Sequence, residues 1–184
     1  MTAREASIHV CPLSRLPETL RISGAASVVT LLAEDQRGAM PPLPGCRHLA
    51  LDLSDISAPR DGYACPDRSH MDKLLAFARR WDRRRPLLIH CYAGVSRSTA
   101  AAFAVACALQ PGKNEREIAD DLRAASPSAT PNPRIVALAD AALDRSGRMV
   151  EAARAIGRGR DCFEGEVFRL RLPGLERQIP AYQA

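Results

Sequence analysis

Residues 90–98, which read HCYAGVSRS, bring several reactive side chains together in a short stretch. The thiol of Cys91 is followed by Gly94, and the guanidinium of Arg97 stands six positions after the cysteine. An apolar run precedes His90, and an alanine-rich segment follows the arginine. The pattern predicts a strand that ends at His90 and a helix that begins near Arg97, with a tight loop between them.

Such a loop is suited to binding a tetrahedral oxyanion. Its backbone N–H groups and the first turn of the helix converge and carry positive potential. Gly94 permits backbone angles that a side chain would hinder, and Arg97 can bind two oxygens of a phosphate at once. In the same field the thiolate of Cys91 is stabilised and can act as a nucleophile near neutral pH. These residue types at this spacing therefore predict phosphoryl transfer to sulfur.

The pattern His90-Cys91-x-x-Gly94-x-x-Arg97-Ser98 resembles the signature of the cysteine-dependent protein phosphatases, both tyrosine-specific and dual-specificity. The Arg-Ser pair looks most like the dual-specificity branch. The segment 128–133, SATPNP, is similar to the Pro-Asn segment that follows the signature in that branch. The likeness covers the middle of the chain, from residue 49 to about residue 132, and the last forty residues or so match nothing in the family.

The resemblance implies a role for each residue of the signature. Cys91 would be the nucleophile and Arg97 the phosphate clamp, and Ser98 would stabilise the thiolate as it leaves. His90 would hold the loop or help to stabilise the thiolate by its charge. Neither a metal nor a cofactor is implied, because the arginine and the amides compensate the phosphate charge. The substrate would contact the backbone N–H groups of Tyr92, Ala93, Gly94, Val95, Ser96 and Arg97.

The scheme also needs a general acid for the leaving oxygen, and three of the aspartates that precede the cysteine are candidates. Asp55 ends the apolar-polar alternating segment 49–56, where the dual-specificity pattern has its acid. Asp61 lies deeper in the following Pro/Gly-rich loop, nearer to the family's usual separation, and Asp52 is third. We expect Asp55 to be the acid, with Asp61 as the alternative.

Strands that alternate with helices and are followed by a helical half predict a three-layer domain of the α/β or α+β class. The resemblance implies an α/β fold, a three-layer α-β-α domain whose central sheet is mainly parallel and four-stranded. We expect a phosphatase domain over residues 1–157 and an extension over 158–184 that packs on it. Strands are predicted at 7–11, 26–32, 49–56 and 87–90, with an edge strand at 164–172. Helices are predicted at 13–21, 70–81, 97–109, 114–125, 132–144 and 148–156.

Composition narrows the class of protein. The 184-residue chain carries a net charge of +5, which favours anionic partners mildly and makes nucleic acid an unexpected one. No apolar run is long enough to span a membrane, and the six cysteines include no Cys-x-x-Cys pair. The arginine and alanine bias suggests a bacterial chain, and we expect a cytoplasmic enzyme whose partner is a phosphorylated protein, with phosphotyrosine leading.

Two other functions stay open at this stage. The same loop could serve a non-protein ester such as a phosphoinositide, a nucleotide or an RNA 5′ end. It could also bind phosphate without turnover, if no acid works with the cysteine.

Further positions could contribute to binding. Tyr92 and Tyr63 could line the pocket entrance, and Arg134 could be a second contact on the phosphate side. The arginine-rich run 79–85 should lie at the opposite edge of the sheet, because it feeds the beginning of the strand that ends at His90.

Overall fold

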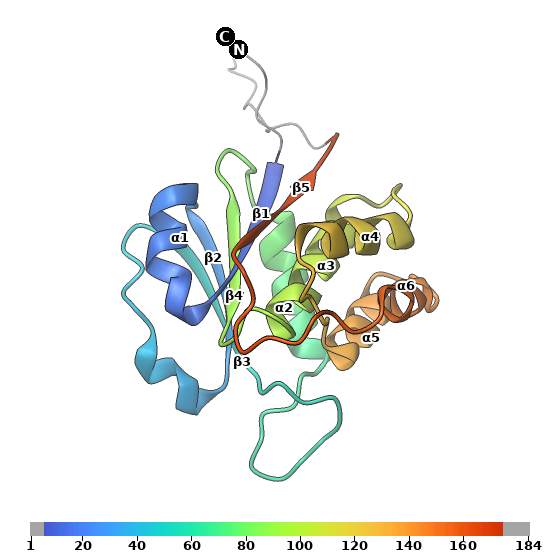
Figure 1. The fold of residues 1–184 in the computed structure, drawn as a ribbon, viewed down its shortest axis with the longest axis horizontal. Coiled ribbons are helices and arrows are strands. Elements are labelled where there is room, and N and C mark those ends of the chain that lie inside the picture. Colours follow the sequence, from blue (N-terminus) through green and yellow to red (C-terminus); the bar gives the residue numbers. More distant parts are fainter. Residues whose placement is uncertain (1–5, 175–184) are drawn as a thin grey trace.

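The computed structural model describes residues 6–174, which form one five-stranded sheet with helices on both faces (Figure 1). The strands are β1 (Ala6–Pro12), β2 (Ser27–Leu32), β3 (Arg47–Asp52), β4 (Leu87–Cys91) and β5 (Phe168–Leu172), in the order β3-β2-β4-β1-β5. The first four run parallel, and β5 lies antiparallel on the β1 edge. The predicted three-layer, mainly parallel α/β fold is confirmed, and β5, the predicted edge strand, joins the four parallel strands in one five-stranded sheet.

Two hydrophobic clusters separate the layers. The smaller cluster includes Cys11, Leu16, Val28 and Leu88 and lies beneath α1 (Leu16–Ser23). The larger cluster fills the opposite face, which five helices cover. These are α2 (Arg68–Arg79), α3 (Arg97–Leu109), α4 (Glu115–Ala125), α5 (Pro133–Ala142) and α6 (Arg148–Ile156). Short 3₁₀ segments, η1 (Leu13–Arg15) and η2 (Glu34–Ala39), follow β1 and β2.

Helix α3 is buried along almost its whole length, as its small apolar residues predict. Alanine side chains let it pass close to β1, β4, α2, α4 and α5, which all contact it. Its first turn therefore has a fixed position relative to the end of β4, the strand that carries Cys91. No helix within residues 6–174 has the length and apolarity that a membrane crossing requires.

One strand is shorter than its alternation pattern predicts. β3 ends at Asp52, which pairs with Leu32 at the last position of β2, so no strand remains beside residues 53–56. Asp55 therefore lies in the loop beyond β3 and not on the strand. The loop continues to Asp67, which caps α2 by accepting a hydrogen bond from the His70 backbone N–H at 3.1 Å.

The chain after α6 returns across the carboxyl end of the parallel strands before it enters β5 (Figure 1). We call residues 157–167 the crossing segment. Gly159 donates its N–H to Thr130 Oγ1 at 3.0 Å, and Ser14 Oγ donates to Glu164 Oε2 at 2.8 Å. The part of the predicted 158–184 extension that lies within the described residues thus contacts the sheet and its loops, and residues 175–184 are outside them.

Candidate active site

The residues between β4 and α3 form a tight loop, residues 91–97, which we call the Cys91 loop. Cys91 is the last residue of β4, and its side chain is 1% exposed. Its sulfur accepts the Gly94 N–H at 3.2 Å and lies 3.1 Å from the buried Ser98 Oγ. An N–H group and a hydroxyl from separate parts of the strand-loop-helix unit therefore lie at hydrogen-bond distance from one sulfur, and both can donate to a thiolate.

The carbonyl groups of the Cys91 loop are held by three segments that are distant in sequence. Tyr92 O accepts from Leu13 N at 3.0 Å, and Ala93 O accepts from Gly165 N of the crossing segment at 2.8 Å. The segment between α4 and α5 contributes two more bonds. Thr130 N donates to Val95 O at 3.0 Å and Asn132 N to Ser96 O at 3.3 Å.

The carbonyl groups of the Cys91 loop thus accept hydrogen bonds, whereas several of its backbone N–H groups are not used in this way. The backbone N–H groups of Ala93, Val95 and Ser96 have no acceptor among residues 6–174. Gly94 has φ +72°, and a Cβ there would lie 2.7 Å from the Pro12 nitrogen. Only glycine fits this combination of backbone angle and close approach. The loop is thus a preformed set of donors at the N-terminus of α3, a combination suited to an oxyanion.

Arg97 is the first residue of α3, and only one part of its guanidinium is hydrogen-bonded within the described residues. Nη1 donates to Gln36 Oε1 at 2.9 Å and to the Leu53 carbonyl at 3.1 Å. Nε is buried without a hydrogen-bond partner among residues 6–174, and Nη2 donates to none of them. The protein therefore anchors the guanidinium through Nη1 and leaves the Nε–Nη2 edge without hydrogen bonds to these residues. That edge is the pair of donors that can bind two oxygens of one anion.

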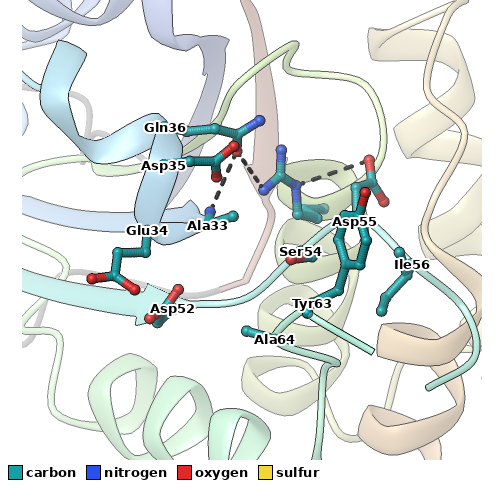
Figure 2. A pocket seen from close by; sticks show the side chains of 12 residues that line it. Ala33, Glu34, Asp35, Gln36, Asp52, Ser54, Asp55, Ile56, Tyr63 and Ala64 are labelled. Atoms are coloured by element: carbon teal, nitrogen blue, oxygen red, sulfur yellow. Dashed lines mark hydrogen bonds and ion pairs between the residues drawn. The ribbon is translucent and has the colours of Figure 1, made fainter. Parts of the chain in front are cut away.

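The aspartate favoured from sequence lies next to this arginine. Asp55 Oδ1 accepts from Ser96 Oγ at 2.7 Å and from Asn132 Nδ2 at 2.7 Å. The other carboxylate oxygen, Oδ2, is 3.9 Å from Arg97 Nε (Figure 2). Asp61 is exposed and makes no hydrogen bond or ion pair with residues 6–174. The structure thus brings Asp55, and not Asp61, to the Cys91 loop.

A cavity of about 820 Å³ opens beside Arg97. Its lining comes from η2, the end of β3 and the following loop, and includes Asp55, Asp52 and Tyr63 (Figure 2). Asp52, the third acid candidate, lies 3.6 Å from Arg37 Nη2. The sulfur of Cys91 is not part of the lining and lies deeper, beneath the loop.

His90 is fully buried behind the loop. Its Nε2 lies 2.7 Å from Thr30 Oγ1, which is also 2.8 Å from His48 Nε2. Burial lowers the pKa of His90 to about 4, so the imidazole is neutral at pH 7. Of the two roles expected for His90, holding the loop fits a neutral side chain, whereas stabilising a thiolate by positive charge does not.

Two other buried cysteines differ from Cys91 in their surroundings. Burial raises the pKa of Cys11 and of Cys107 to about 12, so both thiols are protonated at neutral pH. All six cysteines of the chain are free.

The remaining binding candidates have separate positions. Tyr63 lines the cavity, whereas Tyr92 lines a groove with Leu13 and Glu164. Arg134 donates Nε to the Pro66 carbonyl at 2.5 Å, so it supports the loop that carries the cavity wall. The arginine-rich run lies before β4, at the end of the strand opposite to Cys91, as expected.

Solved structures with this architecture allow a comparison. DUSP15 is 17% identical with a TM-score of 0.57, and the match covers 83% of this chain and 96% of that one. Human DUSP28 is 19% identical with a TM-score of 0.59, covering 76% and 89%. A human tyrosine phosphatase-like serine/threonine/tyrosine-interacting protein is 18% identical with a TM-score of 0.60, covering 78% and 99%. No family model and no curated protein sequence matches the chain.

The chain has the fold of the dual-specificity phosphatases. At these identities the likeness extends to the fold alone.

Three residues of the site were missed from sequence. Gln36 anchors Arg97, Asn132 holds Asp55, and Gly165 fixes the Cys91 loop. Asn132 alone carried a signal, the Pro-Asn-Pro turn, which marks a helix start without indicating what its amide would contact. Gln36 contacts Arg97, which is 61 residues away in the chain, and Gly165 contacts Ala93, which is 72 residues away (165 − 93 = 72). No local sequence pattern reveals contacts at these separations.

Proposed function

We propose that the protein is a metal-independent cysteine phosphatase that hydrolyses phosphate monoesters through a phosphocysteine intermediate. The observation that carries the proposal is the Nε–Nη2 edge of Arg97, which makes no hydrogen bond with residues 6–174 and lies beside a loop of unpaired amides that surrounds a buried sulfur. These groups supply the positive potential that a metal ion supplies in other phosphoryl transfers.

In the first step the Cys91 thiolate attacks the phosphorus of a monoester. The S–P bond forms as the bond from phosphorus to the leaving oxygen breaks. Asp55, which must enter this step protonated, gives its proton to that oxygen, and the product alcohol departs. Arg97 and the loop amides hold the three non-bridging oxygens, where charge resides in the transition state.

In the second step water attacks the phosphocysteine. Asp55, now ionised, takes a proton from the water as the S–P bond breaks, and inorganic phosphate leaves. The Ser98 hydroxyl, 3.1 Å from the sulfur, donates to the thiolate that is released. The balance is one monoester and one water converted to one alcohol and one phosphate, with the enzyme unchanged.

The contacts of Asp55 support this role. Asn132 Nδ2 and Ser96 Oγ fix one carboxylate oxygen, so the other is directed beside Arg97, where the phosphoryl group would bind. A carboxylate that gives a proton and later takes one must be held in a fixed orientation, and this matters more than its exposure to solvent.

The substrate in this proposal is a phosphorylated protein, with phosphotyrosine the leading residue and dual specificity included. A cytoplasmic, bacterial setting is part of the same proposal. A non-protein ester or phosphate binding without turnover are the outcomes that would replace it.

The test is hydrolysis of para-nitrophenyl phosphate by the native protein and by Cys91→Ser, in chelator, with Cys107→Ser as the matched control. Loss in the first variant and retention in the second would support the cysteine mechanism. If the native protein binds vanadate but releases no nitrophenol, the site is a phosphate-binding module and the proposal is wrong.

A further inference from the structure

The wall of the cavity beside Arg97 is strongly acidic. Four carboxylates line it, those of Glu34, Asp35, Asp52 and Asp55, against the single guanidinium of Arg97 (Figure 2). The chain as a whole carries a net charge of +5. The sign of the charge around this cavity is therefore opposite to that of the molecule, although the proposed substrate is itself an anion.

Two of the four carboxylates are already engaged within the protein. Asp55 accepts hydrogen bonds from Ser96 and Asn132, and Asp52 lies 3.6 Å from Arg37 Nη2. These contacts account for their charge without any ligand.

Glu34 and Asp35 are different. Both are exposed at the start of η2, and neither makes a hydrogen bond or an ion pair with any residue of 6–174. The nearby Arg60 is placed over the ring of Tyr63, 4.7 Å from its centroid, and is not paired with them. Two free carboxylates are thus left on the rim.

The backbone of η2 sets the distance of Glu34 and Asp35 from the position where the phosphoryl group would bind. Gln36 is the next residue of η2, and its Oε1 accepts hydrogen bonds from Arg97 Nη1 at 2.9 Å and from the Ala33 N–H at 3.3 Å. Glu34 and Asp35 therefore stand within one or two residues of a side chain bonded to the phosphate clamp (Figure 2).

A second observation marks where the anion belongs. Arg97 lines this cavity and is 4% exposed, and its buried Nε has no hydrogen-bond partner in residues 6–174. A buried unpaired donor of this kind is satisfied by a bound oxyanion. The phosphoryl group would occupy this deep position, and the rest of the substrate would pass the two carboxylates.

We propose that the substrate is a protein segment with a basic side chain next to its phosphorylated residue, and that Glu34 and Asp35 bind this cation. The inference rests on the proposed function and names its substrate class. A lysine or arginine at the rim gains ion pairs, whereas a polyphosphorylated lipid headgroup, a nucleotide or RNA places further negative charge against the same carboxylates.

The experiment compares phosphotyrosine peptides that differ only in the two residues flanking the tyrosine, which are lysine, alanine or glutamate. The native protein should hydrolyse the lysine peptide about tenfold faster in kcat/KM than the glutamate peptide, as one or two exposed ion pairs would give. The preference should shrink with added salt, because exposed charges are screened.

The variant Glu34→Gln/Asp35→Asn should bring the ratio of the two peptides close to one. Its matched control is Glu117→Gln/Glu151→Gln, which removes two exposed charges from α4 and α6 and should keep the native ratio. Because both double variants change the net charge equally, only a local effect separates them.

The outcomes distinguish this inference from the proposed function. Native hydrolysis of para-nitrophenyl phosphate with equal rates on all three peptides would overturn the inference and leave the phosphatase proposal standing. If no turnover occurs, binding of the same peptides to the Cys91→Ser protein by fluorescence anisotropy still reads the preference. Tighter binding of the glutamate peptide, or of an inositol polyphosphate, would overturn it.

Discussion

Replacing Gly165 with alanine should impair the Cys91 loop from outside, through a residue that touches no substrate. A Cβ at this position would lie 2.9 Å from Gly94 O and 3.3 Å from Val95 Cγ2. Carbon atoms prefer separations of about 3.5 Å or more, so the crossing segment and the loop must move apart by several tenths of an ångström. That movement also lengthens the 2.8 Å hydrogen bond from Gly165 N to Ala93 O.

The magnitude follows from the sensitivity of catalysis to position. A misplacement of about 1 Å costs roughly a hundredfold, so a few tenths should lower kcat/KM for para-nitrophenyl phosphate about threefold to tenfold. Overpacking of this size should lower the free energy of unfolding by about 1 kcal/mol. The protein would remain folded at 25 °C, and the loss of rate would exceed any loss of folded protein.

The assay measures kcat/KM, vanadate affinity and urea unfolding for Gly165→Ala. Gly112→Ala is the matched control, because a Cβ there has no neighbour within 4 Å. Vanadate affinity should fall with kcat/KM in the first variant only. Native activity in Gly165→Ala, or equal losses in both variants, would show that the crossing segment does not position the loop.

Three further predictions concern residues around the Cys91 loop. His90 has its pKa lowered from 6.5 to about 4 by burial, so its contribution to stability, about 3 kcal/mol, is full above pH 6.5 and is lost as the pH falls from there through 4. When the pH is lowered from 7 to 4.5, the free energy of urea unfolding should fall by about 2 kcal/mol less in His90→Asn than in the native protein. An equal fall in both proteins would contradict the reasoning. Asn132→Ala should lower the free energy of unfolding by about 1–2 kcal/mol, because Asn132 Oδ1 caps α5. Asn132→Asp should keep the cap but lose the donor to Asp55, so kcat should fall. A fully active Asn132→Asp protein would refute the positioning role. Asp55→Asn should lower kcat about a hundredfold and flatten one limb of the pH–rate profile, with Asp61→Asn near native, and the reverse order would move the general acid to Asp61.

The strand, loop and helix start around Cys91 were predictable because their geometry is local. A buried apolar strand, a glycine that must adopt positive φ and a helix start at Arg97 are properties of adjacent residues, and the structure has all three. The helices of the second half were predicted for the same reason. Their apolar spacing and the asparagine before Pro133 indicate where helices run and begin, and Asn132 does cap α5.

The fifth strand shows how far such patterns extend. Alternation over residues 164–172 predicted an edge strand, and Phe168–Leu172 forms it, but the sequence gives no partner or direction. Its pairing with β1, from Ala6 opposite Leu172 to Val10 opposite Phe168, follows from the path of the crossing segment. Residues 164–167 lie outside the strand, and Gly165 among them donates its N–H to Ala93 O of the Cys91 loop.

The sequence alone indicated the reactive groups, a thiol, an arginine and a set of backbone amides between a strand and a helix, because neighbours in the chain place these groups. Only the folded chain shows which aspartate lies beside them, which glutamine anchors Nη1 of Arg97, and which carboxylates line the cavity. Asp55, Gln36 and Gly165 come from three loops whose positions depend on the packing of the whole sheet. Contacts between residues far apart in the chain leave no periodic pattern in it, so only the folded protein reveals them.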